Sequence, residues 1–507
     1  MTRSFVWPLA LLLACGDSDE FEPPPGGSLS VTQAGAQDIE EFRRMLRGGE
    51  IPPVESFDQL GFFAEHAIDQ PEADCGFTVC VHPQLAVAPR FDDGNWTMAF
   101  ASFNTAVTAE SRERDAVHLA VVVDISVYTD RVREELVDGI EGLVGALEPE
   151  DRVTLIVYGD GAEVVRDGAA PTEVVPGELP ALQAVEEGSA LYDGLALAVD
   201  RLVQDEAALA GGRILLVGAA RAVTGITDRE RIVALGAAAA QEGIGMSIVG
   251  VGNDYEPDIA RALAEQGTAT LASAHGDEIP GVIAAQAELS LVPLATDMEL
   301  RIRPAPGYAA GAVHGVRDAA GGGAGVVLRI PGLFLGARTG GDDVDEMVGR
   351  RGGGGGVFVR LWPQADAAER IGPGAPAFTA EVSYTDHDSG ERVEYEVGVD
   401  NGLAPGENPD EFWPHFSDEA HAKPFMMLNM WLAVDYALRL HRDGHCEQAM
   451  GVAEMMEQSV EVWQDAYDDA DIEADAELLF LLRAVIAEGC TAMPVPPTFV
   501  DAGCFGT

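Results

Sequence analysis

The sequence predicts an α/β protein in which a doubly wound parallel sheet is inserted into a β-sandwich-like domain and is followed by a C-terminal helical segment. Three observations lead to this prediction. Between residues 117 and 290, short apolar runs alternate with amphipathic stretches, as in buried parallel strands and their connecting helices. Strand-like runs bounded by turn residues lie on both sides of this stretch. Three amphipathic stretches with short connections occupy residues 425–488.

The central alternation is regular enough to assign each element. Ligands of a doubly wound sheet bind where the carboxyl ends of the strands meet the loops, so we expect any site of this unit there. The predicted strands cover residues 117–124, 152–158, 213–217, 244–252 and 269–272, with an edge strand at 163–166. The predicted helices cover residues 132–147, 190–205, 229–242, 257–266 and 278–289.

The flanking regions lack this alternation. Pro83 and Pro89 are turn signals, and the glycine runs at 321–323 and 352–356 predict flexible loops. Helices are expected at residues 37–49 and 56–67, and in the tail at 425–441, 445–463 and 473–488. Strands are expected at 77–81, 84–88 and 96–104, and then at 298–302, 325–330, 357–361, 378–384 and 393–399. Because strands lie on both sides of the parallel unit, we expect one sandwich built from both.

Composition limits the classes of partner. The 507 residues carry 85 acidic and 31 basic side chains, for a formal net charge of -54. Such a field repels nucleic acid and anionic lipid headgroups, because phosphate binding needs clustered Lys and Arg. We therefore expect no nucleic-acid partner, and we interpret the charge chiefly as a source of solubility.

The N-terminus is typical of an export signal. Arg3 precedes a short apolar run at residues 5–14, and Cys15 follows in a setting that resembles the bacterial lipobox. We expect a signal peptide at 1–14, lipidation of Cys15 and an acidic Pro/Gly tether at 15–35, with an unlipidated secretory signal as the alternative. Gly16 in place of Asp favours the outer membrane over the inner one. The remaining boundaries are a leader region (36–115), the parallel-sheet unit (116–290), a β-rich domain (291–410) and a helical region (411–507).

The cysteines predict disulfides. Cys75 and Cys80 suit a small local loop, and Cys446 and Cys490 lie at the ends of two helical segments that would meet in an antiparallel pair. Cys504 is left over. A zinc site would need four ligands at compact spacing, and we find no such cluster in the sequence.

Several segments resemble the von Willebrand factor type A domain. Residues 119–126, Leu-Ala-Val-Val-Val-Asp-Ile-Ser, match its first strand and loop, and residues 150–158 match the strand that opens the next unit. Residues 188–194 match its middle loop, and 213–217 its fourth strand. Residues 41–53 resemble the leader of a family of bacterial A-domain lipoproteins, which also carry a C-terminal extension.

The resemblance implies a metal-ion-dependent adhesion site, from which this sequence departs. Asp124 and Ser126 occupy the first two positions, and Ser189 replaces a threonine. Tyr128 stands where the second serine belongs, and Ala219, after Gly218, where the family has aspartate. A hard cation prefers several oxygen ligands, so we expect a degenerate site with no cofactor, or at most weak binding of Mg²⁺ or Ca²⁺. Asp130 or Asp193 could compensate.

The predicted function is binding rather than catalysis. No nucleophile, phosphate-binding or zinc-protease motif is present, so we expect no catalytic residue and no enzyme activity. The leading hypothesis is an envelope-anchored scaffold that binds an unknown protein partner through the A-type domain and the membrane through its lipid. The alternatives are a metal-dependent (Mg, Mn or Ca) adhesin with a compensated site, an enzyme or enzyme subunit with an unrecognised pocket, and a helical tail that provides the interaction surface.

Overall fold

The computed structural model describes residues 29–492 apart from 34–36, 67, 69, 91–93, 108–115, 175–185, 206–211, 253–254, 267–268, 292, 336–355, 365–373, 403–414, 417–421 and 468. The predicted signal peptide, Cys15, most of the tether and Cys504 lie outside the described residues, as does most of the glycine run at 352–356. None of the described helices is long and apolar enough to cross a membrane.

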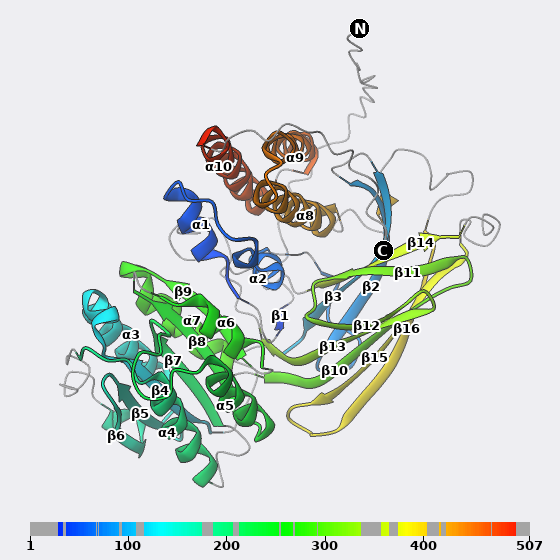
Figure 1. Ribbon diagram of the computed structural model, residues 1–507. Helices are drawn as coiled ribbons and strands as arrows, with labels where there is room; N and C mark the ends of the chain where they lie inside the picture. Colours follow the sequence, from blue (N-terminus) through cyan, green and yellow to red (C-terminus); the bar gives the residue numbers. More distant parts are fainter. Residues whose placement is uncertain are drawn as a thin grey trace, which may run out of the picture.

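The described chain folds into three packed parts (Figure 1). The strands are β1 (Leu29–Gln33), β2 (Cys80–Arg90), β3 (Gly94–Thr105), β4 (His118–Asp124), β5 (Arg152–Tyr158), β6 (Ala162–Ala169), β7 (Gly212–Gly218), β8 (Gly245–Val251), β9 (Ala269–Ala274), β10 (Pro293–Pro304), β11 (Tyr308–His314), β12 (Asp318–Gly322), β13 (Gly325–Leu335), β14 (Gly356–Pro363), β15 (Pro376–Asp386), β16 (Arg392–Asp400) and β17 (His415–Phe416). The helices are α1 (Glu40–Arg47), α2 (Gln59–Ala64), α3 (Arg133–Ala146), α4 (Leu191–Gln204), α5 (Arg229–Gln241), α6 (Pro257–Ala264), α7 (Ile279–Leu291), α8 (Ala422–Arg442), α9 (Cys446–Tyr467) and α10 (Ala470–Ala492).

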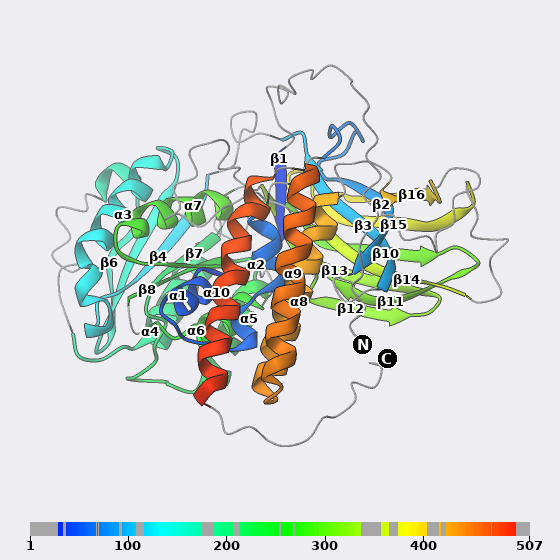
Figure 2. The ribbon, with the colours of Figure 1, turned by 90° about the horizontal axis from the view of Figure 1, so that it is seen from above.

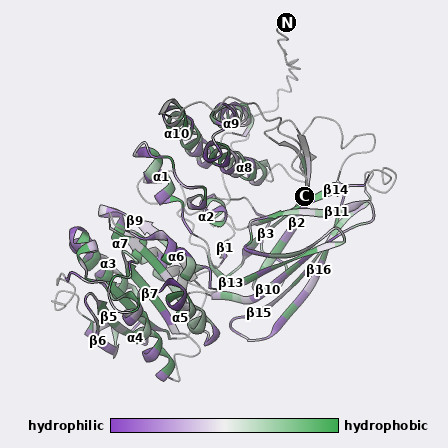
Figure 3. Ribbon diagram, in the orientation of Figure 1, coloured by the Kyte–Doolittle hydropathy of each residue, from purple (hydrophilic) through white to green (hydrophobic). Residues whose placement is uncertain are grey.

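The central part is a six-stranded sheet in the order β6-β5-β4-β7-β8-β9. Strands β5, β4, β7, β8 and β9 are parallel, and β6 is an antiparallel edge strand. β4 and β7 are buried along their whole length, because α3 and α7 cover one face and α4, α5 and α6 the other. Figure 3 shows these strands as hydrophobic ribbons. The doubly wound sheet predicted from the apolar runs is confirmed.

The second part is an antiparallel sandwich formed from both sides of the central part. One layer holds β2, β3, β14 and β11, the other β13, β10, β15 and β16, and β1 pairs with β3 and with β13. The chain leaves the sandwich after β3 and re-enters it at β10, so the parallel-sheet unit is an insertion. Apolar side chains of both layers form one core, which includes Val31, Phe103, Leu300 and Leu328. The predicted insertion is therefore confirmed.

Three details of the sandwich differ from the sequence prediction. β2 runs straight through Pro83, which had indicated a turn. Pro83 has no backbone N–H group to donate. It is tolerated because, on the edge of β2 that faces β17, the described pairing involves only Ala86 and Val87. Residues 321–323 are not a flexible loop: Gly321 and Gly322 belong to β12, and positive φ angles turn the chain tightly into β13. β1, β11, β12 and β17 had no predicted counterpart.

The third part joins the leader helices to the C-terminal helices. α8, α9 and α10 pack side by side, and Figure 2 shows them as long rods. Their apolar faces share one core with α1, α2 and the outer face of β3 and β14. Asp38, just before α1, accepts a bond from the Ser273 backbone N–H of β9 at 2.7 Å. The leader therefore contacts all of the larger parts of the fold.

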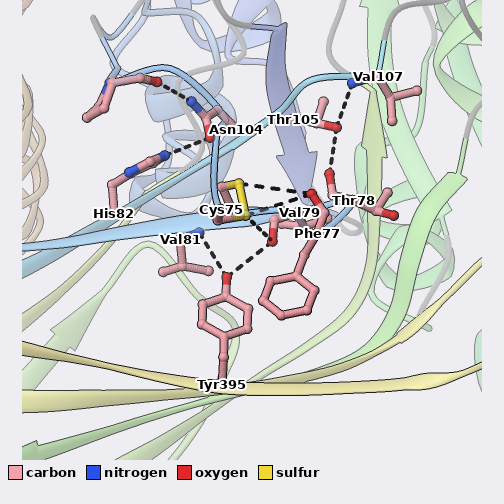
Figure 4. The surroundings of a disulfide bond; sticks show 12 residues. Cys75, Phe77, Thr78, Val79, Val81, His82, Asn104, Thr105, Val107 and Tyr395 are labelled. Atoms are coloured by element: carbon pink, nitrogen blue, oxygen red, sulfur yellow. Dashed lines mark hydrogen bonds between the residues drawn. A yellow bond between two sulfur atoms is a disulfide. The ribbon is translucent and has the colours of Figure 1, made fainter.

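Both predicted disulfides are present. Cys75 and Cys80 close a five-residue separation at the start of β2, and Cys446 is bonded to Cys490. Figure 4 shows Tyr395 of β16 beside the first bridge. The Tyr395 hydroxyl accepts from Val81 N at 3.0 Å and donates to Val79 O at 3.1 Å, which ties this loop to the opposite layer.

Candidate functional site

The candidate site lies at the carboxyl edge of the parallel sheet, where β4 and β7 end side by side. Asp124 is the last residue of β4, and its side chain is fully buried. One carboxylate oxygen accepts a hydrogen bond from Ser126 N at 2.9 Å, and the other accepts from Ala219 N at 3.1 Å. Asp124 therefore joins the loop after β4 to the loop after β7.

The loop after β4 is held by bonds to its own backbone. The Ser126 hydroxyl accepts from Tyr128 N at 3.3 Å, which caps the short 3-10 helix at Val127–Val132. Thr129 donates to Asp124 O at 2.8 Å. The guanidinium of Arg133 donates to Asp124 O at 2.8 Å and to Ser126 O at 3.2 Å. Arg133 thus bonds the backbone carbonyls of the loop and leaves the Asp124 carboxylate to the two amides.

The middle loop and the loop after β7 are bonded to each other. Ser189 is fully buried, and its hydroxyl donates to Arg221 O at 2.7 Å. Ser189 O accepts from Val223 N at 2.9 Å and from Thr224 N at 3.1 Å. In the loop after β7, Ala220 has a φ of 53°, a left-handed conformation that costs about 1–2 kcal/mol for a residue with a Cβ. The compensating bonds explain why the chain holds this turn.

Tyr128, which replaces a serine of the family pattern, faces an arginine. The Arg221 guanidinium lies 4.8 Å from the centroid of the Tyr128 ring, within the range of a cation–π contact. A positive group of the protein itself therefore lies beside the loops that would surround a metal ion. The sequence comparison with the family pattern identified Tyr128 but gave no signal for Arg221.

Burial controls the electrostatics of the site. Loss of hydration raises the pKa of Asp124, against the lowering effect of its bonds from Ser126 and Ala219 and of nearby Arg133. Burial, and then the neighbouring Asp124 carboxylate, raises the pKa of Tyr158 well above its ordinary value. The same desolvation lowers the pKa of Arg133. Each of these shifts disfavours charge within the site.

The residues predicted to hold a metal ion offer few free oxygen atoms to an octahedral divalent cation. Such an ion needs several negative or neutral oxygens that can turn toward it. Here Asp124 supplies the carboxylate, its two oxygens already accept backbone N–H bonds, and the Ser126 hydroxyl accepts a third. Ala219 supplies no side-chain oxygen. The Asp124, Ser126 and Ser189 side chains have no exposed surface.

The structure brings the predicted residues together but uses them differently. Asp124, Ser126, Ser189 and Ala219 lie in one bonded group of loops, as the resemblance implied. Of the two candidates for compensation, Asp130 is exposed in the 3-10 helix, whereas Asp193, exposed in the first turn of α4, places its carboxylate beside Gly225 of the loop after β7. Sequence reasoning missed Thr129, Arg133 and Tyr158, whose roles depend on backbone carbonyls and burial rather than on a motif.

Comparisons with known proteins give structural neighbours only. No family model matches the chain, and no curated protein is similar to it. Its structural neighbours include a von Willebrand factor type A protein from Catenulispora acidiphila, at 12% identity over 75% of this chain and 87% of that one, with a TM-score of 0.46. VWA2 from Sulfolobus acidocaldarius, a paralog of ArnB, is 14% identical over 82% of this chain and 98% of its own, with a TM-score of 0.44.

A third neighbour is the conserved hypothetical protein BatB from Bacteroides thetaiotaomicron, 18% identical over 34% of this chain and 97% of its own, with a TM-score of 0.26. The fold class itself follows from the strand order and pairing of the inserted sheet.

Proposed function

We propose that this chain is a non-catalytic protein-binding module that recognises its partner through the loops at the carboxyl edge of the parallel sheet, without a metal ion. We call these loops the apex: residues 125–129, 159–161, 186–189 and 219–225. The observation that carries the proposal is the closed hydrogen bonding of Asp124, whose two oxygens tie two apex loops together. The carboxylate thus acts as a structural link in a preorganised surface.

The apex also offers apolar side chains for contact. Val127 is 38% exposed and Val223 is 46% exposed. Their backbone amides bond to Glu186 O at 2.8 Å and Ser189 O at 2.9 Å, so both flank the middle loop. Exposed apolar groups held on a rigid frame favour protein contact over small-molecule chemistry.

Two buried groups support a binding rather than a catalytic role. Asp124 and Tyr158, the last residues of β4 and β5 next to the apex, have raised pKa values, and neither has exposed surface. A general acid or base must reach the proton that it transfers, and these two side chains face the interior.

We also propose that a lipid on Cys15 anchors the chain to the cell envelope, with the outer membrane as the favoured location. Support comes from the apolar run at residues 5–14 and the polar, Pro-rich stretch after Cys15. A tethered body would then present the apex to partners in the same compartment.

Site-specific photo-crosslinking tests the binding surface. A photoreactive amino acid placed at position 127 or 223 should give adducts of discrete mass in native membranes, and excess EDTA should leave their yield unchanged. Val203 is the matched control, because it is 41% exposed but lies in the last turn of α4, at the opposite edge of the sheet.

The outcomes separate the competing functions. Adducts that require added Mg²⁺ would favour a metal-dependent adhesin and contradict the metal-free apex. Adducts from position 462 of α9, where Val462 is 67% exposed, with none from the apex, would transfer the binding role to the helical tail. Equal yields at positions 127 and 203 would overturn the proposal.

A further inference from the structure

The ends of three helices meet at a cluster of metal-ligand side chains. His441 lies in the last turn of α8, Cys446 begins α9, and Cys490 lies near the end of α10. The imidazole nitrogen and the two sulfur atoms all lie within 4.8 Å of one another. In this structure the two cysteines form a disulfide, with Cα atoms 5.7 Å apart. The cluster is far in sequence from the apex and takes no part in it.

The position of His441 is not explained by its role in packing. Its Nε2 atom is buried and has no hydrogen-bond partner among the described residues. An unpaired buried nitrogen costs about 1–3 kcal/mol. By contrast, His118 places Nδ1 2.9 Å from a carboxylate oxygen of Asp205. The His441 imidazole therefore lies close to both sulfur atoms, and its Nε2 has no hydrogen-bond partner among the described residues.

A glycine leaves room beside this nitrogen. A Cβ added at Gly489 would come 3.3 Å from His441 Nε2 and 2.6 Å from Ile51 Cδ1. Any larger residue next to Cys490 would therefore displace the imidazole or the leader side chain. Gly489 therefore allows the imidazole to pack beside the residue that precedes Cys490.

The donor set has a definite chemical preference. Two thiolates and one imidazole suit a soft or borderline ion such as Zn²⁺. Zinc accepts three such protein ligands with a water molecule in the fourth position of a tetrahedron. All three residues are partly exposed, so the cluster lies near the surface of the helical part.

We propose that Cys446, Cys490 and His441 form a redox-gated zinc site, in which the disulfide and the zinc-bound state are alternatives. A dithiol reductant transfers two electrons and two protons to the disulfide, becomes a disulfide itself, and leaves two thiols. Zn²⁺ then replaces the two thiol protons, which pass to solvent, and binds Nε2 of neutral His441.

The two states would link the helix ends differently. The disulfide connects α9 to α10 only, whereas the zinc-bound state also includes α8 through His441. Reduction in the presence of zinc would therefore replace one cross-link with another rather than release the helical part. The site would then keep the C-terminal helices packed on the leader under oxidising and reducing conditions alike.

Zinc binding by the full chain provides the test. The chain carries Cys75→Ser and Cys80→Ser to remove the other bridge, is reduced with a water-soluble phosphine, and is titrated with Zn²⁺ against a chromogenic chelator. We expect one zinc per reduced chain at this site and none at the site in the oxidised chain. Co²⁺ in place of Zn²⁺ should give a thiolate-to-metal charge-transfer band.

Matched histidine variants make the result specific. His441→Ala keeps every cysteine and should weaken zinc binding by about 100-fold or more, beyond the effect of losing an outer hydrogen bond to a ligand. His445→Ala changes an exposed histidine in the same connection and should leave the affinity unchanged. Absence of zinc binding by the reduced chain, or equal affinities in the two variants, would overturn the proposal.

Discussion

Carboxylates are buried both at the apex and where the leader helix α1 packs on α10, which we call the leader contact. The two regions stabilise these carboxylates in opposite ways. At the apex, backbone amides hold Asp124, and the nearest guanidinium, that of Arg133, bonds carbonyl groups instead. At the leader contact, Arg43 of α1 contacts Glu65 and lies 3.3 Å from Asp475 of α10. The carboxylate at the apex is thus stabilised by backbone dipoles, and those at the leader contact are stabilised by a charged guanidinium.

The difference bears on what each region can tolerate. A carboxylate held by amides loses hydrogen bonds when it is changed, but leaves no opposite charge behind. Removing one member of a buried ion pair leaves the other without compensation, which is the costlier defect. The leader contact should therefore be the more fragile of the two, and substitutions can test that ranking.

The largest effect is expected for Arg43→Met. The side chains of Arg43, Glu65 and Asp475 are 11%, 4% and 1% exposed, so the variant removes the guanidinium that two buried carboxylates share. We expect a loss of about 3–5 kcal/mol in the free energy of unfolding, measured by urea denaturation. Arg44→Met is the control, because Arg44 is 48% exposed and its pair with Glu41 should contribute less than about 1 kcal/mol. Equal losses in the two variants would contradict the ranking.

A smaller and more local effect is expected for Asp124→Asn. In the wild type each oxygen of Asp124 accepts a bond from a backbone N–H group. The side-chain NH₂ of Asn would face one of these N–H groups without accepting from it, at a cost of about 2–3 kcal/mol. Hydrogen exchange should speed up at the amides of Ser126 and Ala219 and stay unchanged in α10. Asp130→Asn, at an exposed position in the next turn, should change neither the free energy of unfolding nor the exchange rates of these amides. Uniform loss of protection across the chain would show that the apex is not a separate unit.

The smallest effect concerns pH at the leader contact. Burial raises the pKa of Glu40 to about 7 from 4.5, although Arg43 and Arg47 lie 3.9 and 3.6 Å away. Between these two values the folded chain holds more protons than the unfolded chain, so the free energy of unfolding falls as pH rises from about 4.5 to 7. We expect Glu40→Gln to remove about 1–2 kcal/mol of this fall, measured by urea denaturation at pH 5 and pH 8. An identical pH dependence in the wild type would contradict the raised pKa.

The sequence predicted those parts of the fold in which local pattern and tertiary role agree. β4, β5, β7 and β8 are apolar runs because they are buried on both faces. β11 and β12 are rich in Ala and Gly, which have low strand propensity, and pairing with β14 and β13 makes them strands. β1 exists through pairing with residues some 70 and 300 positions away along the chain. No local signal could reveal these three.

The candidate site shows the same limit. Asp124, Ser126 and Ser189 could be placed by their resemblance to a known loop pattern, and Tyr128 and Ala219 could be identified as departures from it. What satisfies Asp124 could not be predicted, because one partner is the backbone N–H of Ala219, which any residue other than proline provides. The meeting of His441 with a disulfide likewise depends on how three helices pack, although Cys446–Cys490 itself was predicted and is confirmed.

Because the parallel-sheet unit is an insertion, the sandwich can stay assembled even when the chain is cut within that unit. β1 and β3 precede the unit, β10 and β13 follow it, and the two groups share a ladder and a core. A protease that cuts the chain between β3 and β10 would therefore leave two fragments that stay assembled. A chain built in this way can be cut once in its inserted unit and still hold its C-terminal helices against the leader helices.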